Sequence, residues 1–265
     1  MMPIVGAFRA TRLLLHLTYG FAVALVFPQL NQGLRRQILR RWSCRLLRIL
    51  NVEVIFELMD MPRSGIVVTN HISWLDVFVL NAMTPMRFVA KSEVRRWPLF
   101  GWLCARAQTL FIERGRARDA ARINKQVGRL LNEGESLVVF PEGTTTDGRE
   151  VRAFHASLLQ PAIDARAPVY PIAIRYHDEH GMRSMAAAYI DDVSFIASLW
   201  NILSCKCLRV HLVATPSIDA TDSDRRTVAH KARQQIHEAL LHMSSISDEP
   251  CDIASCQAVA DYTAA

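Results

Sequence analysis

The chain has 265 residues, a mass of 29.9 kDa and a formal net charge of +6, with 51% hydrophobic residues and a mean hydropathy of +0.12. Its length suits one large domain with a helical appendage, and its hydropathy, high for a soluble enzyme and low for a polytopic membrane protein, indicates a protein that sits on a bilayer. The positive charge agrees with an anionic membrane surface, whereas no nucleic acid is expected as a partner because the sequence lacks zinc-ligand spacing, an RNP-like aromatic strand and a Lys-rich tail.

The N-terminal region contains an apolar segment at residues 13–27, and no Asp, Glu, Lys or Arg occurs between Arg12 and Arg35. This segment is shorter than the roughly 20 residues that a perpendicular transmembrane helix needs, although tilt or the polar flank would extend it. A signal peptide with a cleavage box at residues 22–24 is the alternative. We expect an anchor that stays attached to the protein.

The next segment, residues 34–50, has the pattern of an amphipathic helix. One face collects Leu34, Ile38, Trp42, Leu46 and Ile49, and most of the other face collects Arg36, Arg40, Arg41, Arg45 and Arg48. Two structures fit this pattern: a helix packed on the protein core with a solvated basic face, and a helix at the membrane interface with its apolar side at the acyl-chain boundary. The neighbouring anchor favours the second, so we expect residues 1–50 to form a membrane-associated helical segment.

From residue 52 onward, short apolar runs alternate with stretches of helical periodicity. The predicted strands are 52–58, 66–69, 87–90, 109–112, 136–140, 168–175, 186–190 and 207–214, and the predicted helices are 74–82, 98–106, 116–132, 154–165, 194–203 and 222–242. This alternation is typical of an α/β fold with a mixed, largely parallel sheet flanked by helices, which we expect over residues 51–243. The tail, residues 244–265, is predicted to be disordered because of its Ser, Asp and Ala content.

The heptapeptide NHISWLD, residues 70–76, follows the predicted strand 66–69 and contains His71 and Asp76. Imidazole titrates near neutrality, and a carboxylate beside it fixes its tautomer and stabilises the imidazolium, so this pair could deprotonate an alcohol. The five-residue offset requires a turn before the helix begins, and Asn70 and Ser73 favour such a turn. The alternative is that His71 only caps the helix.

A second polar segment, FPEGTTTDG at residues 140–148, follows the predicted strand 136–140. In largely parallel sheets, ligands bind beyond the carboxyl ends of the strands, where both segments lie. This segment offers a carboxylate, hydroxyl groups and a permissive glycine that suit a polar head group, from Glu142, Gly143, Thr144, Thr145 and Thr146.

Arg114 lies between the two segments, after strand 109–112, where its guanidinium could hold a phosphate or a carboxylate in a bidentate manner. The alternative for Arg114 is a surface ion pair with Glu113 or Asp119. Covalent catalysis is disfavoured because no GxSxG elbow surrounds Ser73 and no cysteine lies beside a matching His motif. We therefore expect direct attack by a bound alcohol.

The segments NHISWLD, KSEV (91–94), FIERG (111–115), FPEGTTTDG and VYPIAIRY (169–176) follow one another in an order that resembles the lysophospholipid acyltransferases. This family, which includes the 1-acylglycerol-3-phosphate acyltransferases, is marked by an NHxxxxD box and an FPEGT box. The resemblance covers about residues 60–215. It implies a glycerol-phosphate acyltransferase-like fold and a reaction in which an acyl thioester of coenzyme A or acyl carrier protein acylates a lysolipid hydroxyl, with no cofactor and no metal.

The resemblance also implies roles for individual residues. His71 would be the base that activates the acceptor hydroxyl, and Asp76 would orient it. Arg114 would bind the anionic head group of the acceptor. The acceptor pocket would be shaped by Glu142, Gly143 and Thr144, and Pro171 in the last segment would lie along the acyl-chain side.

One position departs from the pattern of the family. Many phosphatidate-forming members have an arginine directly after FPEGT, where this chain has Thr145, and a hydroxyl replaces a bidentate phosphate contact poorly. Arg114, or Arg149 or Arg152 downstream, would then have to compensate. FPEGTTTDG, with FHASLLQP at 154–161 and SLWNIL at 198–203, looks closer to a bacterial branch that includes lyso-ornithine lipid acyltransferases.

The sequence thus predicts an enzyme on the cytoplasmic face of a bacterial inner membrane that acylates 1-acyl-sn-glycerol-3-phosphate to phosphatidic acid. The alternative acceptor is lyso-ornithine lipid. Two remote alternatives are a metal-dependent phosphoester hydrolase with His71, Asp76, Glu142 and Asp147 as ligands, and a lipid-binding protein without activity.

Overall fold

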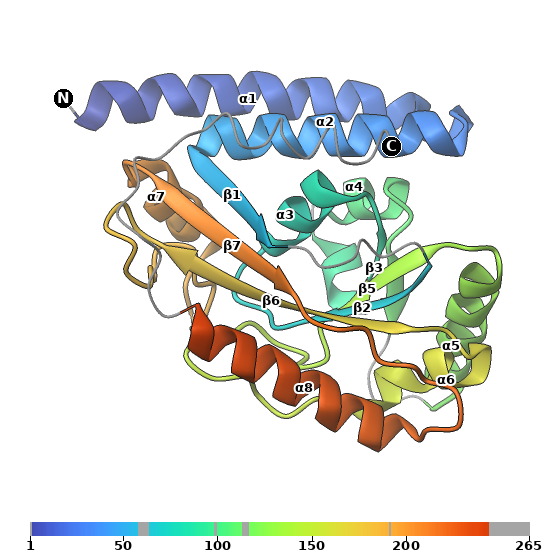
Figure 1. The fold of residues 1–265 in the computed structure, drawn as a ribbon. Helices are drawn as coiled ribbons and strands as arrows, with labels where there is room; N and C mark the ends of the chain where they lie inside the picture. The colour runs from blue at the N-terminus through green and yellow to red at the C-terminus, as the bar shows by residue number, and fades with distance from the viewer. Residues whose placement is uncertain (1, 58–63, 98–99, 113–116, 191, 244–265) are drawn as a thin grey trace.

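A computed structural model describes residues 2–57, 64–97, 100–112, 117–190 and 192–243, and within them one seven-stranded sheet forms the centre of the molecule (Figure 1). The strands are β1 (Val52–Glu57), β2 (Gly65–Thr69), β3 (Arg87–Lys91), β4 (Leu110–Ile112), β5 (Ser136–Val139), β6 (Val169–His177) and β7 (Leu208–Ala214). Their order is β1-β7-β6-β2-β5-β3-β4. Only β6 and β7 pair in the antiparallel sense, so the predicted mixed, largely parallel sheet is confirmed.

Helices cover both faces of the sheet (Figure 1). One face carries α1 (Met2–Val26), α2 (Gln32–Leu50), α3 (Asp76–Met83), α4 (Phe100–Arg106) and α7 (Phe195–Ser204), and the other carries α5 (Ala117–Asn132), α6 (Gln160–Ala165) and α8 (Arg225–His242). Each face has its own hydrophobic cluster, because alternate residues of the central strands point in opposite directions. For example, Val67 belongs to the cluster under α2 and α3, and Val68 to the cluster under α5 and α8.

The structure corrects the prediction for α2. The C-terminal half of its apolar face packs on α3 and β1, with Leu46, Leu47 and Leu50 all buried in the core, as in the alternative of a core-packed helix. The arginines occupy the opposite side, where Arg41 and Arg45 are exposed. The amphipathic pattern is the same in both situations, and the contacts with the domain decide between them.

Helix α1 lies along α2 at the surface of the molecule (Figure 1). Its inward side is covered, and its outward side exposes Phe8, Leu14, Leu15, Tyr19, Leu25 and Val26. The segment Ala7–Gln29 is long and apolar enough to cross a membrane, yet it packs lengthwise against the domain. The turn between the two helices contains the short 3-10 helix Phe27–Gln29, and the Asn31 side chain then caps α2 by accepting a hydrogen bond from Leu34 N.

The predicted strand 186–190 is wrong. This segment is a loop, in which Ala187 and Ala188 are buried and Tyr189 N donates a hydrogen bond to Ile72 O at 2.9 Å. Its apolar run reflects packing of the loop against the core rather than pairing in a sheet. The predicted helix 154–165 is also divided, into a 3-10 helix at Ala156–Leu159 and α6, which has Pro161 in its first turn.

Candidate functional site

The two polar segments meet at one edge of the sheet. Strands β2 and β5 are parallel neighbours with Val68 opposite Val139, so the residues that follow them emerge side by side. Strand β6 flanks β2 on its other side, with Thr69 opposite Ile172, and continues several residues beyond the end of β2. The site is therefore built from two strand-end loops with β6 running behind them.

The turn after β2 is fixed to β6 by Asn70. Its side-chain Nδ2 donates to Ile174 O at 2.9 Å, and its Oδ1 accepts from Ile174 N at 2.8 Å. Asp76 N donates to Ser73 O at 3.2 Å, and α3 begins at Asp76. The predicted turn at Asn70 and Ser73 is therefore present, and it allows residues five positions apart to meet.

His71 Nδ1 lies 2.8 Å from Asp76 Oδ2. The same oxygen accepts hydrogen bonds from the backbone of Ile72 (2.8 Å) and Ser73 (3.0 Å), while Oδ1 accepts from the hydroxyl of Tyr176 at 2.7 Å. Asp76 is completely buried. Because a carboxylate only accepts hydrogen bonds, Nδ1 of His71 carries the proton and Nε2 keeps a lone pair for a substrate.

The His71 ring is further held by Phe140, the residue after β5. The two rings stack with 3.9 Å between their centroids and 20° between their planes. The His71 side chain keeps 20% of its surface exposed, so it is oriented by its neighbours and still reachable.

Glu142 braces the two loops. It is 5% exposed, and its two carboxylate oxygens accept hydrogen bonds from the backbone N–H groups of His71 and Arg152, each at 2.9 Å. Burial raises the pKa of Glu142, and these two hydrogen bonds partly oppose that shift. The structure does not place Glu142 on the wall of the cavity described below, in contrast to the expectation that it shapes an acceptor pocket.

Gly143, Thr144 and Thr145 do line that cavity. Gly143 has a φ of 71°, a conformation that favours glycine, and it turns the chain after the strand. The Thr145 hydroxyl donates to Tyr189 O, so it ties the loop 184–190 to the site. Thr146 also binds the neighbouring loop, because its backbone N–H donates to His71 O at 2.8 Å.

A cavity of about 1270 Å³ opens beside His71 and runs under the N-terminal helices. Its wall is mainly apolar and includes Leu17 and Phe21 of α1, Trp42 and Leu46 of α2, Phe78 of α3 and Leu103 of α4. The polar groups on the wall include His71, Lys91, Arg106 and His155. A long hydrocarbon chain with a polar end fits this combination.

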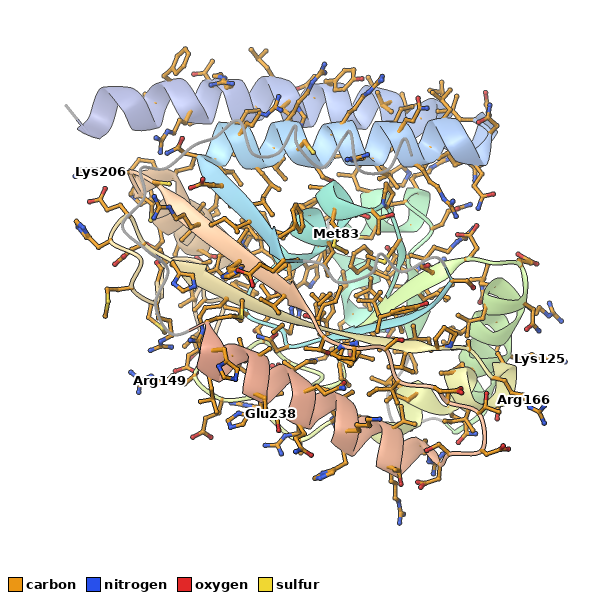
Figure 2. All side chains as sticks on the ribbon, viewed as in Figure 1. Met83, Lys125, Arg149, Arg166, Lys206 and Glu238 are labelled. Carbon is orange, nitrogen blue, oxygen red and sulfur yellow. The ribbon has the colours of Figure 1, made fainter. Side chains whose placement is uncertain are left out.

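The other residues singled out in the sequence take different positions. Arg114 lies outside the described residues, so its predicted role stays untested. Arg149 projects from the surface, as Figure 2 shows, and pairs with Asp147 at 3.3 Å. Neither Arg149 nor Arg152 lines the cavity, and Pro171 is buried within β6 away from its wall.

The four residues considered above as metal ligands, His71, Asp76, Glu142 and Asp147, are not arranged around a common point that could hold a metal ion. Asp76 and Glu142 already accept the hydrogen bonds described above, and Asp147 pairs with Arg149 and Arg183. Within the described part of the chain, no group of three or more His, Cys, Asp or Glu side chains is arranged to hold a metal ion.

Sequence reasoning missed four contributors to the site. Lys91 falls within the KSEV segment, which gave a signal for the family but no role for the side chain. Phe140 and Tyr176 likewise fall within the segments FPEGTTTDG and VYPIAIRY, which gave no role for these side chains because their contacts join segments that are far apart in the sequence. Arg106, on the cavity wall, gave no signal of its own.

Comparison with known proteins shows to which family this site belongs. The family model "Acyltransferase" matches residues 52–175. A lyso-ornithine lipid O-acyltransferase of Pseudomonas aeruginosa is 38% identical over 208 residues, which cover 78% of this chain and 80% of the relative. The chain belongs to the lysophospholipid acyltransferase family. A 1-acyl-sn-glycerol-3-phosphate acyltransferase of Neisseria meningitidis is a second relative of this lysophospholipid acyltransferase, 36% identical over 71% of this chain and 74% of the relative.

A solved structure supports the fold of this acyltransferase. The 1-acyl-sn-glycerophosphate acyltransferase PlsC of Thermotoga maritima superposes with a TM-score of 0.61 at 19% sequence identity, covering 91% of this chain and all of that one. At this identity the likeness concerns the fold alone.

Proposed function

We propose that this acyltransferase sits on a membrane and moves a fatty acyl group from a thioester of coenzyme A or acyl carrier protein to the hydroxyl of a lysolipid. The observation that carries the proposal is the His71–Asp76 pair, 2.8 Å apart, in which His71 lies on the wall of an apolar cavity of about 1270 Å³. A lysolipid substrate needs an apolar cavity for its hydrocarbon chain and a base beside its hydroxyl, and the structure places His71 on the wall of such a cavity.

In the proposed reaction, Nε2 of His71 takes the proton of the acceptor hydroxyl while that oxygen attacks the thioester carbonyl. Asp76 stabilises the imidazolium that forms, because its buried carboxylate lies against Nδ1. The tetrahedral intermediate then releases the thiolate, and His71 returns the proton to the sulfur. The products are the acylated lipid and a free thiol, so His71 ends in its starting form.

The acceptor is the finer part of the proposal, and 1-acyl-sn-glycerol-3-phosphate is the first candidate. Lys91 and Arg106 place positive charge on the cavity wall, which suits a phosphate. The Neisseria relative carries the corresponding name.

Lyso-ornithine lipid is the second candidate, and Thr145 favours it. The side chain that follows FPEGT is a short hydroxyl that already donates to Tyr189 O, so it does not replace a guanidinium that would clamp a phosphate. A lipid without a phosphate does not need that guanidinium. The Pseudomonas relative is named for this acceptor.

The proposed location is the cytoplasmic face of a bacterial inner membrane. The outward side of α1 presents a row of exposed apolar residues, and the arginines of α2 lie beside it. An apolar stripe flanked by basic residues suits the interface of an anionic bilayer. There the lipid acceptor and a soluble thioester are both within reach.

The test offers purified protein a labelled palmitoyl thioester of coenzyme A or of acyl carrier protein, with lysophosphatidate or lyso-ornithine lipid in vesicles, and identifies the acylated product. We expect His71→Ala to abolish transfer, because the variant lacks the imidazole that Asp76 orients and that takes the proton in the proposed reaction. His237→Ala, an exposed position on α8, is the matched control and should retain full activity. Turnover near the wild-type rate in His71→Ala, or no transfer to either lipid by the wild type, would refute the proposal.

A further inference from the structure

Tyr176 lies behind the His71–Asp76 pair and takes no part in the cavity. It is near the carboxyl end of β6 and only 1% exposed, and its hydroxyl donates to Asp76 Oδ1 at 2.7 Å. It is absent from the wall of the cavity beside His71. Tyr176 therefore contacts the orienting carboxylate without reaching the space that substrates would occupy.

The hydrogen bond has a direct electrostatic consequence. Asp76 is completely buried, and a buried carboxylate is stable only when its oxygens are hydrogen-bonded. Oδ2 accepts hydrogen bonds from His71 and two backbone N–H groups, and Oδ1 accepts one from the hydroxyl of Tyr176. Burial, followed by the charge of Asp76, raises the pKa of Tyr176 well above its usual value, so the phenol stays protonated and donates throughout the neutral range.

Strand β6 holds the site at two points. The backbone of Ile174 binds both ends of the Asn70 amide, and Tyr176, two residues further, binds Asp76. Residues two apart on a strand point to the same side, so Tyr176 and Ile174 face the same helix layer. The turn that carries His71 is thus fixed at its first residue and at its last.

We propose that Tyr176 is a positioning residue for acyl transfer, which sets the orientation of Asp76 and, through it, the basicity of His71. This inference rests on the proposed function, in which His71 acts as the base. By donating to Oδ1, Tyr176 withdraws part of the negative charge that Asp76 presents to His71. Without the donor, Asp76 would hold the imidazolium more strongly and would also be less fixed in place.

The first experiment compares Tyr176→Phe with Tyr170→Phe. Tyr170 lies six residues earlier on the same strand, packs against the same core cluster and lies outside the catalytic pair, so it controls for the loss of a phenol from β6. For Tyr176→Phe we expect kcat to fall on the order of tenfold, as for loss of one hydrogen bond to a charged group, with KM for both substrates unchanged. Tyr170→Phe should keep the wild-type kcat.

The decisive readout is the acidic limb of the pH profile of kcat/KM, where His71 must lose its proton to act. We expect Tyr176→Phe to move this limb to higher pH, by about half a unit or more, because Asp76 then favours the imidazolium more strongly. Site-specific 3-fluorotyrosine at position 176, a stronger donor of nearly the same size, should move the limb the opposite way. This second variant keeps the test intact if Tyr176→Phe does not fold.

A double-mutant cycle separates positioning from packing. If Tyr176 acts through Asp76, then Tyr176→Phe should have much less effect on kcat in an Asp76→Asn background than in the wild type. An unshifted pH limb in both Tyr176 variants, or equal losses in the two backgrounds, would overturn the inference. Failure of the proposed function is distinguishable, because the wild type itself would then transfer no acyl group.

Discussion

At the scale of single residues, some polar side chains of this site hold backbone segments in place and do not point into the cavity. Glu142 has the residue type of a catalytic acid, yet both of its oxygens accept hydrogen bonds from backbone N–H groups, one from each strand-end loop. The pair His71 and Asp76 could be predicted because both residues lie in one heptapeptide. Tyr176 lies 100 residues away from Asp76, and this contact depends on β6 lying next to β2, which no local pattern reveals.

Glu142→Gln tests this bracing role. A glutamine keeps the size of the side chain, but its NH₂ group would face one of the two backbone N–H donors and leave that donor unsatisfied. We expect the free energy of unfolding, measured by urea denaturation, to fall by about 1–3 kcal/mol, with a loss of kcat in the labelled transfer assay. Glu150→Gln, at an exposed position in the same loop, should change neither quantity. Equal stability of the two variants would show that Glu142 does not brace the loops.

At the scale of elements, hydrophobic periodicity identifies helices and strands but does not show what their apolar faces pack against. Residues 34–50 have one apolar and one basic face, and this pattern fits both the membrane interface and the core position that α2 takes. The segment 186–190 shows the same limit, because a loop that buries Ala187 and Ala188 has an apolar run like that of a strand. Tertiary contacts decide both cases, and they join segments that the sequence leaves far apart.

The paired strands β6 and β7 carry two buried histidines that make stability depend on pH. Burial is the largest cause that lowers the pKa of His177 and of His211. A hydrogen bond to Gly181 O opposes the shift for His177, and Glu57 opposes it for His211. The neighbouring Arg175 and His211 lower the pKa of His177 further, while Asp178 raises it.

Both histidines are therefore neutral in the folded protein at a pH where the unfolded chain, with a histidine pKa of about 6.5, begins to bind protons. Stability should be constant above about pH 7 and should fall as the pH decreases through 6.5, until the folded state also becomes protonated. Melting temperatures measured between pH 5 and pH 8 check this. His177→Asn should flatten the decrease, whereas His237→Asn, on the exposed side of α8, should keep it. A wild-type melting temperature that does not fall on acidification would contradict the assignment.

At the scale of the whole molecule, the N-terminal helices have two sides with different surroundings. The inward sides of α1 and α2 form part of the wall of the cavity beside His71, and the outward side of α1 exposes apolar side chains. Deleting residues 1–33 would therefore open the cavity as well as remove the proposed membrane contact, and loss of activity would not show which change caused it. Substitutions on the outward side alone separate the two roles.

Leu14 and Leu25 suit this purpose, because they are 64% and 62% exposed, lie on one side of α1 and do not line the cavity. Removing a leucine from an apolar environment costs about 1.5–3 kcal/mol, and glutamate adds repulsion from anionic lipid. The double variant Leu14→Glu/Leu25→Glu should lower binding to vesicles of anionic phospholipid at least about tenfold in a sedimentation assay, with an unchanged melting temperature. The variant His230→Glu/His237→Glu carries the same added charge on α8, across the sheet, and should sediment like the wild type. If the α1 variant still sediments fully, the outward side of α1 is not the proposed membrane contact, and another surface of the protein binds the vesicles.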